Sequence, residues 1–167
     1  MSRIFPLLIL SILFVSSNLF SQIVFKDDLG LKIKYESKFT PFPHKDRAVG
    51  HNYGGNFYDA SDHYSDSTVF IFIPDHIIKI DTFTLIFYFH GWRNNIDTSL
   101  HKFQLVEQFH DSGKKGILVI PESAKNAPDS FGGKLEEEGI FKELVAEIME
   151  QLKSILRKDI SFRNITL

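Results

Sequence analysis

The residues best suited to carry out chemistry follow an apolar run at positions 83–89, which only Thr84 interrupts. The run ends in His90-Gly91-Trp92, and a short apolar run closed by a glycine turn is typical of a buried central strand. Open α/β sheets place reactive loops at the ends of such strands. Gly91 allows a sharp turn that leaves the amide N–H of Trp92 facing a cleft. The turn therefore indicates a hydrogen-bond donor directed at a ligand.

Acyl-transfer enzymes need a donor of this kind, because their tetrahedral intermediate carries a negative charge on oxygen. Loss of one fixed donor raises the barrier by about 3 kcal/mol. The same residues also fit a histidine buried for packing and followed by a turn glycine. Both interpretations stay open at this point.

A second group of candidates lies in a long polar stretch at positions 37–67. Histidine and carboxylate side chains can bind zinc or calcium, but no His-x-x-x-His and no calcium-loop pattern occurs there. We therefore expect a solvated loop at the rim of a pocket, with no metal and no cofactor. The residues concerned are His44, Asp46, His51, Asp59, Asp62, His63 and Asp66.

The elements that would position these residues follow a regular order. Apolar runs at 69–73, 83–89 and 117–120 predict strands, and residues 99–113 predict a helix between the last two. An apolar stripe of period near 3.6 predicts a second, longer helix over 140–156. Strands that alternate with amphipathic helices indicate an α/β fold with a mostly parallel sheet covered on both faces.

Two further segments complete the expected organisation. Residues 22–36 contain two short strand-like runs and predict an antiparallel hairpin at a sheet edge. Residues 1–21 have the layout of a secretory signal peptide, in which Arg3 precedes an apolar run at 4–15. We expect a secreted or periplasmic protein with one domain over 22–167, and no stable membrane span after signal cleavage.

Composition excludes several functions. The chain has no cysteine, so it contains no disulfide, thiolate metal site or cysteine nucleophile. Its 19 basic residues do not exceed its 21 acidic ones, and no basic stripe is present, so we expect no nucleic-acid partner.

Four features follow one another along the chain: the strand, the His90-Gly91-Trp92 turn, the Ile-Leu-Val-Ile-Pro-Glu-Ser run at 117–123 and the Ser-Phe-Gly-Gly-Lys-Leu-Glu-Glu run at 130–137. Together they resemble the N-terminal part of an α/β-hydrolase. The resemblance is strongest to secreted, serine esterase-like members and covers about 63–167. It implies that the backbone of Trp92 is an oxyanion donor, that His90 and Gly91 shape its loop, and that neighbouring residues bind substrate. Those substrate-binding residues would be Arg93, Asn94, Glu122 and Ser123.

The sequence departs from that family at its most diagnostic motif. No Gly-x-Ser-x-Gly occurs, and in the family the acid and the histidine of the triad follow that serine. We therefore expect an incomplete α/β-hydrolase-like fold, truncated at the C-terminus and inactive alone, whose full form acts on carboxylic esters or related acyl substrates. The alternative is a non-catalytic envelope module that binds a glycan or protein through residues 44–63.

Overall fold

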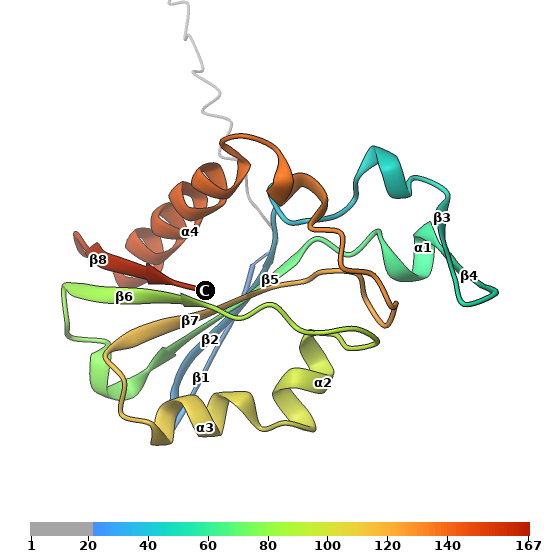
Figure 1. Ribbon diagram of the computed structural model, residues 1–167. Helices are drawn as coiled ribbons and strands as arrows, with labels where there is room; N and C mark the ends of the chain where they lie inside the picture. The colour runs from blue at the N-terminus through green and yellow to red at the C-terminus, as the bar shows by residue number, and fades with distance from the viewer. Residues whose placement is uncertain (1–21) are drawn as a thin grey trace, which may run out of the picture.

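The computed structural model describes residues 22–167. The expected signal peptide at 1–21 lies outside the described residues. The main feature is a six-stranded sheet in the order β1-β2-β5-β7-β6-β8 (Figure 1). Its strands are β1 (Gln22–Asp27), β2 (Gly30–Glu36), β5 (Thr68–Pro74), β7 (Gly116–Pro121), β6 (Thr82–Phe87) and β8 (Ser161–Thr166).

The sheet is mixed, so the expected mostly parallel, incomplete α/β-hydrolase-like fold is wrong. The pairs β1–β2, β2–β5 and β5–β7 are antiparallel, whereas only β6–β7 and β6–β8 are parallel. Parallel neighbours need a crossover of about a dozen residues or more, usually a helix. The short segment 75–81 between β5 and β6 contains no such crossover, so β6 runs opposite to β5. The sequence pattern located β1, β2, β5, β6 and β7 but did not reveal how β5 to β7 are directed.

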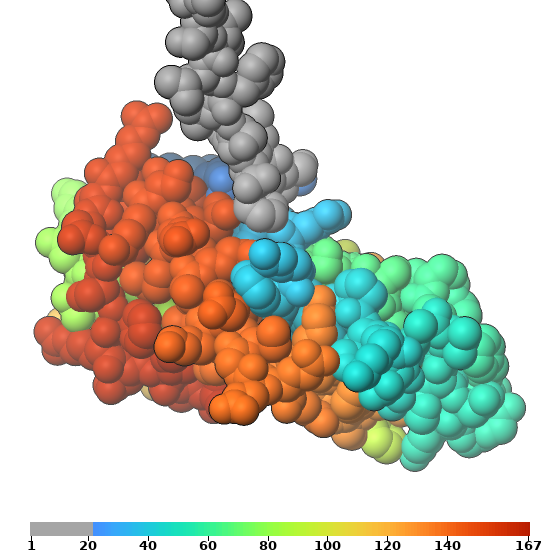
Figure 2. Space-filling model, turned by 90° about the horizontal axis from the view of Figure 1, so that it is seen from above, coloured from blue at the N-terminus to red at the C-terminus, as the bar shows by residue number. Residues whose placement is uncertain are grey.

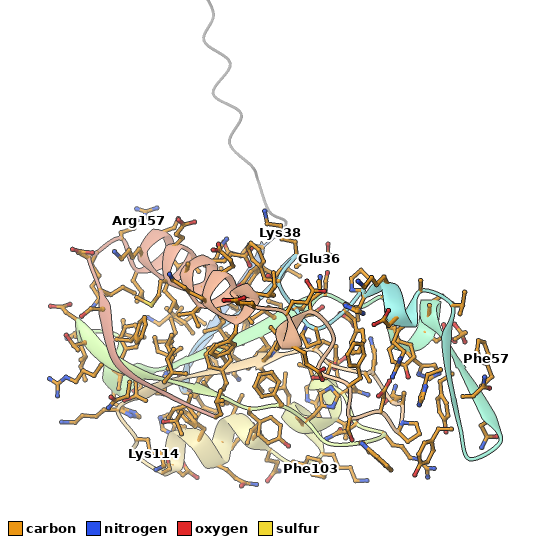
Figure 3. All side chains as sticks on the ribbon, turned by 45° about the horizontal axis from the view of Figure 1, so that its top comes forward. Glu36, Lys38, Phe57, Phe103, Lys114 and Arg157 are labelled. Atoms are coloured by element: carbon orange, nitrogen blue, oxygen red, sulfur yellow. The ribbon has the colours of Figure 1, made fainter. Side chains whose placement is uncertain are left out.

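Helices cover the two faces of the sheet. α4 (Ile140–Leu156) packs on one face, and α2 (Ile96–His101) and α3 (Leu105–Asp111) lie on the other (Figure 1). α4 coincides with the helix predicted from the apolar stripe. The helix predicted over 99–113 is instead two short helices, because the chain adopts a left-handed conformation at Gln104 (φ 51°). Phe103, labelled in Figure 3, is consequently exposed instead of facing the core.

The core is largest between the sheet and α4. Alternate residues of β2, β5, β6 and β7 meet Leu144, Val145, Ile148 and Leu152 of α4. A smaller cluster on the opposite face joins Phe70 and Phe72 to α2 and α3. Burial of apolar area at about 25 cal/mol per Å² makes the α4 layer the main source of stability.

β6 is not the fully buried strand that its apolar run predicts. Phe83, Leu85 and Phe87 face α4 and are buried, whereas Thr84 and Ile86 point to the other face. There they line a hollow of about 590 Å³ beside α3 and β8. Every residue of β8 is exposed, and because successive side chains point to opposite faces, this edge of the sheet is open to solvent on both faces within 22–167.

The long polar stretch contains structure of its own. β3 (Gly50–Tyr53) and β4 (Asn56–Asp59) form an antiparallel hairpin, and α1 (Ala60–His63) follows directly. The hairpin projects from one side of the molecule (Figure 2), and exposed Phe57 lies on it (Figure 3). Phe42 and Tyr64 pack with Ala124 and Ala127 in a third cluster, which attaches the stretch to the loop after β7.

No helix among residues 22–167 is long and apolar enough to cross a bilayer.

The α4 layer gives a direct test of the fold. Ile148 is fully buried, so we expect Ile148→Ala to lower the free energy of unfolding by about 3 kcal/mol through lost burial and the cavity left behind. Urea unfolding followed by circular dichroism measures this change. Glu150→Ala, at an exposed position of the same helix, should change stability by less than about 0.5 kcal/mol. Equal effects of the two substitutions would contradict the packing described.

Candidate active-site cleft

A cleft of about 400 Å³ opens where β6 and β7 end. Three segments line it: the loop after β6, the long loop between β7 and α4, and the stretch after β2. Its walls combine apolar rings and chains with a few polar groups, as ligand sites usually do. The lining residues are Pro41, Phe89, His90, Gly91, Trp92, Ser123, Asp129, Ser130, Phe131, Gly132 and Leu135.

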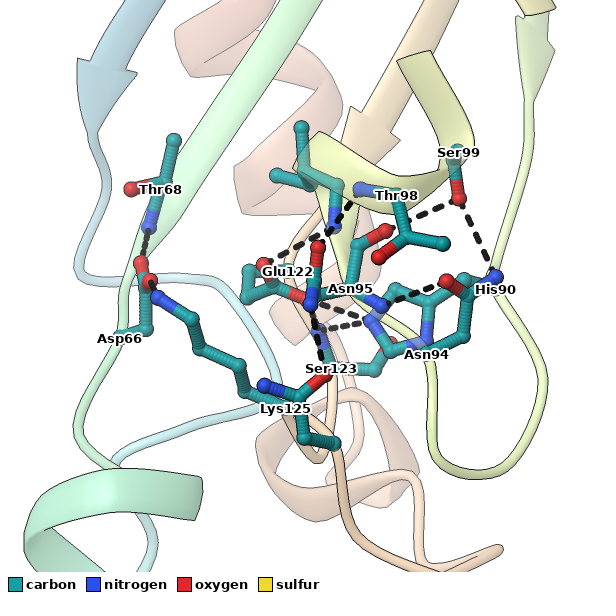
Figure 4. A network of polar contacts seen from close by, with 12 residues as sticks. Asp66, Thr68, His90, Asn94, Asn95, Thr98, Ser99, Glu122, Ser123 and Lys125 are labelled. Carbon is teal, nitrogen blue, oxygen red and sulfur yellow. Dashed lines mark hydrogen bonds and ion pairs between the residues drawn. The ribbon is translucent and has the colours of Figure 1, made fainter. Parts of the chain in front are cut away.

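A buried ion pair connects the two strand ends behind this cleft. The side chains of His90 and Glu122 are almost wholly buried, and Nε2 of His90 hydrogen-bonds Oε1 of Glu122 (Figure 4). The second carboxylate oxygen accepts the backbone N–H of Ile96, the first residue of α2, at 3.1 Å. One carboxylate thus joins the loop after β6, the loop after β7 and the start of α2.

The surroundings of His90 favour the doubly protonated ring. Burial by itself lowers the pKa of His90. The hydrogen bond to Glu122, the carbonyl of Gly91 and the negative charge of Glu122 together raise it by more than burial lowers it, so the pKa lies above its ordinary value. Nδ1 lies 3.0 Å from the Gly91 carbonyl oxygen, so both ring nitrogens face oxygen acceptors. The backbone N–H of Ser123 lies 3.3 Å from Nε2 and 3.2 Å from Oε1 of Glu122, and the carboxylate is the stronger acceptor of the two. We assign an imidazolium on this ground. His90 is therefore a charged positioning group and not a free base.

Backbone hydrogen bonds fasten the loop after β6 to the loop after β7. Arg93 N–H donates to the carbonyl of Ala127 at 3.0 Å, and Asn126 N–H donates to the carbonyl of Asn94 at 2.8 Å. The side chains of Asn95 and Asn126 add a bond of 2.6 Å. The loop is thus fixed on the far side of Trp92 as well as at His90.

The amide of Trp92 lies between these two attachments and is left without a protein partner. Within residues 22–167, no group accepts a hydrogen bond from its N–H or from that of Gly91, whereas the following Arg93 amide is paired. Trp92 also lines the cleft. A fixed, unpaired donor at a cleft wall is what an anionic or carbonyl oxygen needs.

Gly91 leaves this donor uncovered. Its backbone does not have a positive φ, and a Cβ built on it would meet no atom within 4 Å. The protein itself would therefore tolerate a side chain at this position. The space that the missing side chain leaves open is part of the cleft, since Gly91 lines it.

The indole of Trp92 extends along the rim. Its Nε1–H donates to the hydroxyl of Ser130 at 2.7 Å, and its ring meets that of Tyr53 edge-on with centroids 5.1 Å apart. Both rings remain exposed, Trp92 to 51% and Tyr53 to 40%. The β3–β4 hairpin thus adds an aromatic side chain beside the cleft.

Some of the predicted site residues line the cleft and the others do not. His90, Gly91, Trp92 and Ser123 line the cleft. Arg93, Asn94 and Glu122 do not: Arg93 is exposed beyond the lining, and Asn94 is buried with its amide 3.4 Å from the Ser99 hydroxyl. Glu122 lies behind the cleft, where it positions His90 and α2.

Part of the cleft was not identified as functional from the sequence. Arg47 holds Asp129 through Nε–Oδ2 and Nη2–Oδ1 contacts of 2.6 and 3.3 Å, and its guanidinium lies 4.8 Å from the centre of the Phe131 ring. Burial alone raises the pKa of Asp129, but the hydrogen bond and charge of Arg47 and the backbone N–H of Phe131 together outweigh it, and the pKa is lowered. The ion pair spans residues far apart in sequence, so no local pattern could have indicated it.

The polar candidates of the long stretch do not come together. His44 contacts Glu137 at 3.0 Å, His63 lies 2.7 Å from the carbonyl of Lys125, and Asp59 caps α1. Asp66 is paired with Lys125 at 2.7 Å. These groups are thus satisfied in separate places: Lys125 serves both His63 and Asp66, whereas His44 and Asp59 have other partners.

Comparisons with known proteins give no assignment: no protein-family model, no curated protein and no solved structure matches this chain. The function has to be argued from the cleft.

The His90–Glu122 pair predicts a specific dependence of stability on pH. Because the pKa of His90 in the folded chain lies above 6.5, the folded state binds this proton more tightly than the unfolded state. The resulting stability is complete below pH 6.5 and is lost as the pH rises through the folded pKa. We expect Glu122→Gln to remove this dependence and to cost about 3 kcal/mol at low pH, because the buried imidazolium loses its partner.

Urea midpoints measured across that pH range would check this expectation. Glu107→Gln, at an exposed carboxylate of α3, is the matched control and should retain the pH profile of the parent chain. A Glu122→Gln profile parallel to that of the parent would show that the pair does not bind a proton on folding.

Proposed function

We propose that the cleft binds the acyl group of a carboxylic ester or related acyl compound, and that this chain supplies the oxyanion-binding part of an exported, esterase-type hydrolase. The observation that carries the proposal is the unpaired N–H of Trp92 at the cleft wall. The proposal rests on this cleft and on the local likeness of the His90-Gly91-Trp92 turn to esterase loops. It does not rest on the fold class, because the sheet is mixed.

The surroundings of the amide suit an acyl group. The apolar part of the cleft wall can contact the carbon chain of the acyl group, and it is formed by Phe89, Phe131 and Leu135. Among residues 22–167 the only carboxylate that lines the cleft is Asp129, which Arg47 neutralises, so it repels a developing oxyanion less. The loop is fixed at both ends before a ligand arrives, so the donor needs no reorganisation when charge develops.

The same cleft contains no activated nucleophile. Ser130 Oγ accepts from the Trp92 indole, and within 22–167 no serine hydroxyl hydrogen-bonds a histidine. His90, with both nitrogens committed to oxygen acceptors, cannot accept the proton of a serine. Oxyanion stabilisation alone is worth about 3 kcal/mol, so turnover by the chain on its own should be small.

Binding is therefore the decisive measurement. We expect butyrate, a simple carboxylate, to bind the ¹⁵N-labelled chain saturably and to shift the amide proton of residue 92 downfield. Gly91→Ala should weaken this binding tenfold or more, because the added methyl group stands in the open space before the donor. Its urea midpoint should not fall, since the new Cβ meets no atom within 4 Å other than those of its two chain neighbours.

Ser130→Ala serves as the control within the cleft. It removes a hydroxyl that the Trp92 indole uses but leaves the Trp92 amide in place, so the amide shift should persist. Butyrate shifts confined to other residues, or equal affinity of the Gly91→Ala chain, would refute the proposal.

One observation favours a second candidate function, a non-catalytic module that binds a glycan. The exposed rings of Trp92 and Tyr53 form an aromatic pair beside the cleft, and such rings stack on sugar faces. This candidate uses the side chain of Trp92, whereas the acyl proposal uses its backbone.

Trp92→Ala separates the two candidates, because alanine keeps the amide and removes the ring. If the chain is a glycan module, cellohexaose or chitohexaose should bind the parent chain and bind Trp92→Ala at least tenfold more weakly, with Gly91→Ala unaffected. The acyl proposal predicts the reverse pattern for butyrate. Isothermal titration calorimetry with each ligand on the three chains measures both, and no binding of either oligosaccharide would remove the glycan candidate.

A further inference from the structure

A second group of potential ligands lies at the other end of the sheet. Asp75 and His76 belong to the single turn after β5, and His110 lies in the last turn of α3. One ligand atom from each of the three side chains lies within 4.8 Å of the other two, and within 22–167 no other group of three does so. The site is separate from the cleft and does not depend on the function proposed for it.

The spacing fits a small tetrahedral ion. Zinc bound to nitrogen and oxygen at about 2.0–2.1 Å places neighbouring ligand atoms about 3.3 Å apart. Oδ1 of Asp75 is 3.1 Å from Nε2 of His110 and 3.5 Å from Nδ1 of His76. Both edges are already close to the tetrahedral value, and the third edge, between the two histidine nitrogens, is no longer than 4.8 Å.

The other nitrogen of each imidazole also has an oxygen partner. Nδ1 of His110 lies 3.3 Å from a carboxylate oxygen of Asp111. Nε2 of His76 lies 3.4 Å from the carbonyl oxygen of Lys114, a residue labelled in Figure 3. Metal-binding histidines usually donate their second N–H to such a carboxylate or carbonyl, which fixes the tautomer and the ring orientation. Both rings are thus oriented with the ligand nitrogen towards Asp75.

A simple surface ion pair explains only part of this arrangement. Charge attraction accounts for His110 between Asp75 and Asp111, but such exposed pairs contribute little to stability. It does not account for a second histidine whose ring meets that of His110 edge-on at 5.5 Å while its Nδ1 faces the same Asp75 oxygen. Two imidazoles that converge on one carboxylate oxygen form a typical zinc ligand set.

We propose that Asp75, His76 and His110 bind one zinc ion, with water in the fourth position, and that the ion fastens the end of α3 to the turn after β5. The exposure of Asp75 and His76 gives the ion an open path from solvent. No cysteine is present to compete for it.

The test uses the full chain without a histidine tag, treated with EDTA and then dialysed. Titration with Zn²⁺ should show one saturable site, and Co²⁺ in its place should give the visible absorption of a four- or five-coordinate ion. His76→Ala and His110→Ala should each weaken zinc binding at least tenfold. Ca²⁺ and Mg²⁺, which prefer all-oxygen ligands, should not compete.

Two further variants make the result specific. His101→Ala removes an exposed histidine of α2 outside the cluster and should bind zinc as the parent does. Asp111→Asn keeps all three ligands but weakens the oriented partner of His110, so its affinity should fall about tenfold. Because these positions are on the surface, circular dichroism should show each variant folded. Absence of a single saturable site, or equal zinc affinity of His76→Ala, His110→Ala and the parent, would overturn the proposal.

Discussion

The cleft depends on one buried ion pair, His90 with Glu122. Removal of two charges from water is costly, and a buried pair is tolerated only where its remaining hydrogen-bonding capacity is used. Here the carboxylate accepts from His90 with one oxygen and from the first amide of α2 with the other. The imidazolium uses its second N–H on the carbonyl of Gly91. These bonds fix the loop after β6 and the loop after β7, which line the cleft, together with α2 behind them, so the electrostatic requirement of the pair sets the shape of the site.

The unpaired donor follows from the way the loop is attached. His90 fixes it on one side and the backbone bonds of Arg93 and Asn94 fix it on the other, which leaves the amides of Gly91 and Trp92 between them without a protein acceptor. The positive φ of Arg93 (54°) turns the chain back towards Ala127 immediately after this amide. A water molecule can satisfy the free N–H in the open cleft, so the donor carries little cost until a ligand replaces that water.

The sequence was informative where structure is determined locally. The stripe from Ile140 to Leu156 predicted α4 because helix periodicity is a property of neighbouring residues, and the Trp92 turn was found because a glycine follows an apolar run. Strand direction was missed, since it depends on pairing between segments and on the short connection at 75–81. The partner of His90 lies 32 residues away, and His110 lies 35 residues from Asp75. No spacing rule reveals such contacts, so Glu122 was assigned to substrate and the zinc ligands were not identified.

The mixed sheet explains why the two candidate sites lie at opposite ends of the molecule. β6 and β7 run parallel and end together at the cleft, whereas antiparallel β5 ends near the start of β7. The α2–α3 layer therefore extends from Glu122, which accepts from its first amide, to Asp75, which contacts His110 in its last turn. This layer buries only a small cluster of residues against the sheet, so apolar packing holds it less firmly than α4. Polar contacts at both ends of the α2–α3 layer compensate for this weaker apolar packing. An ion bound at the α3 end would limit the motion of these two helices, whose other end lies next to the loops that line the cleft.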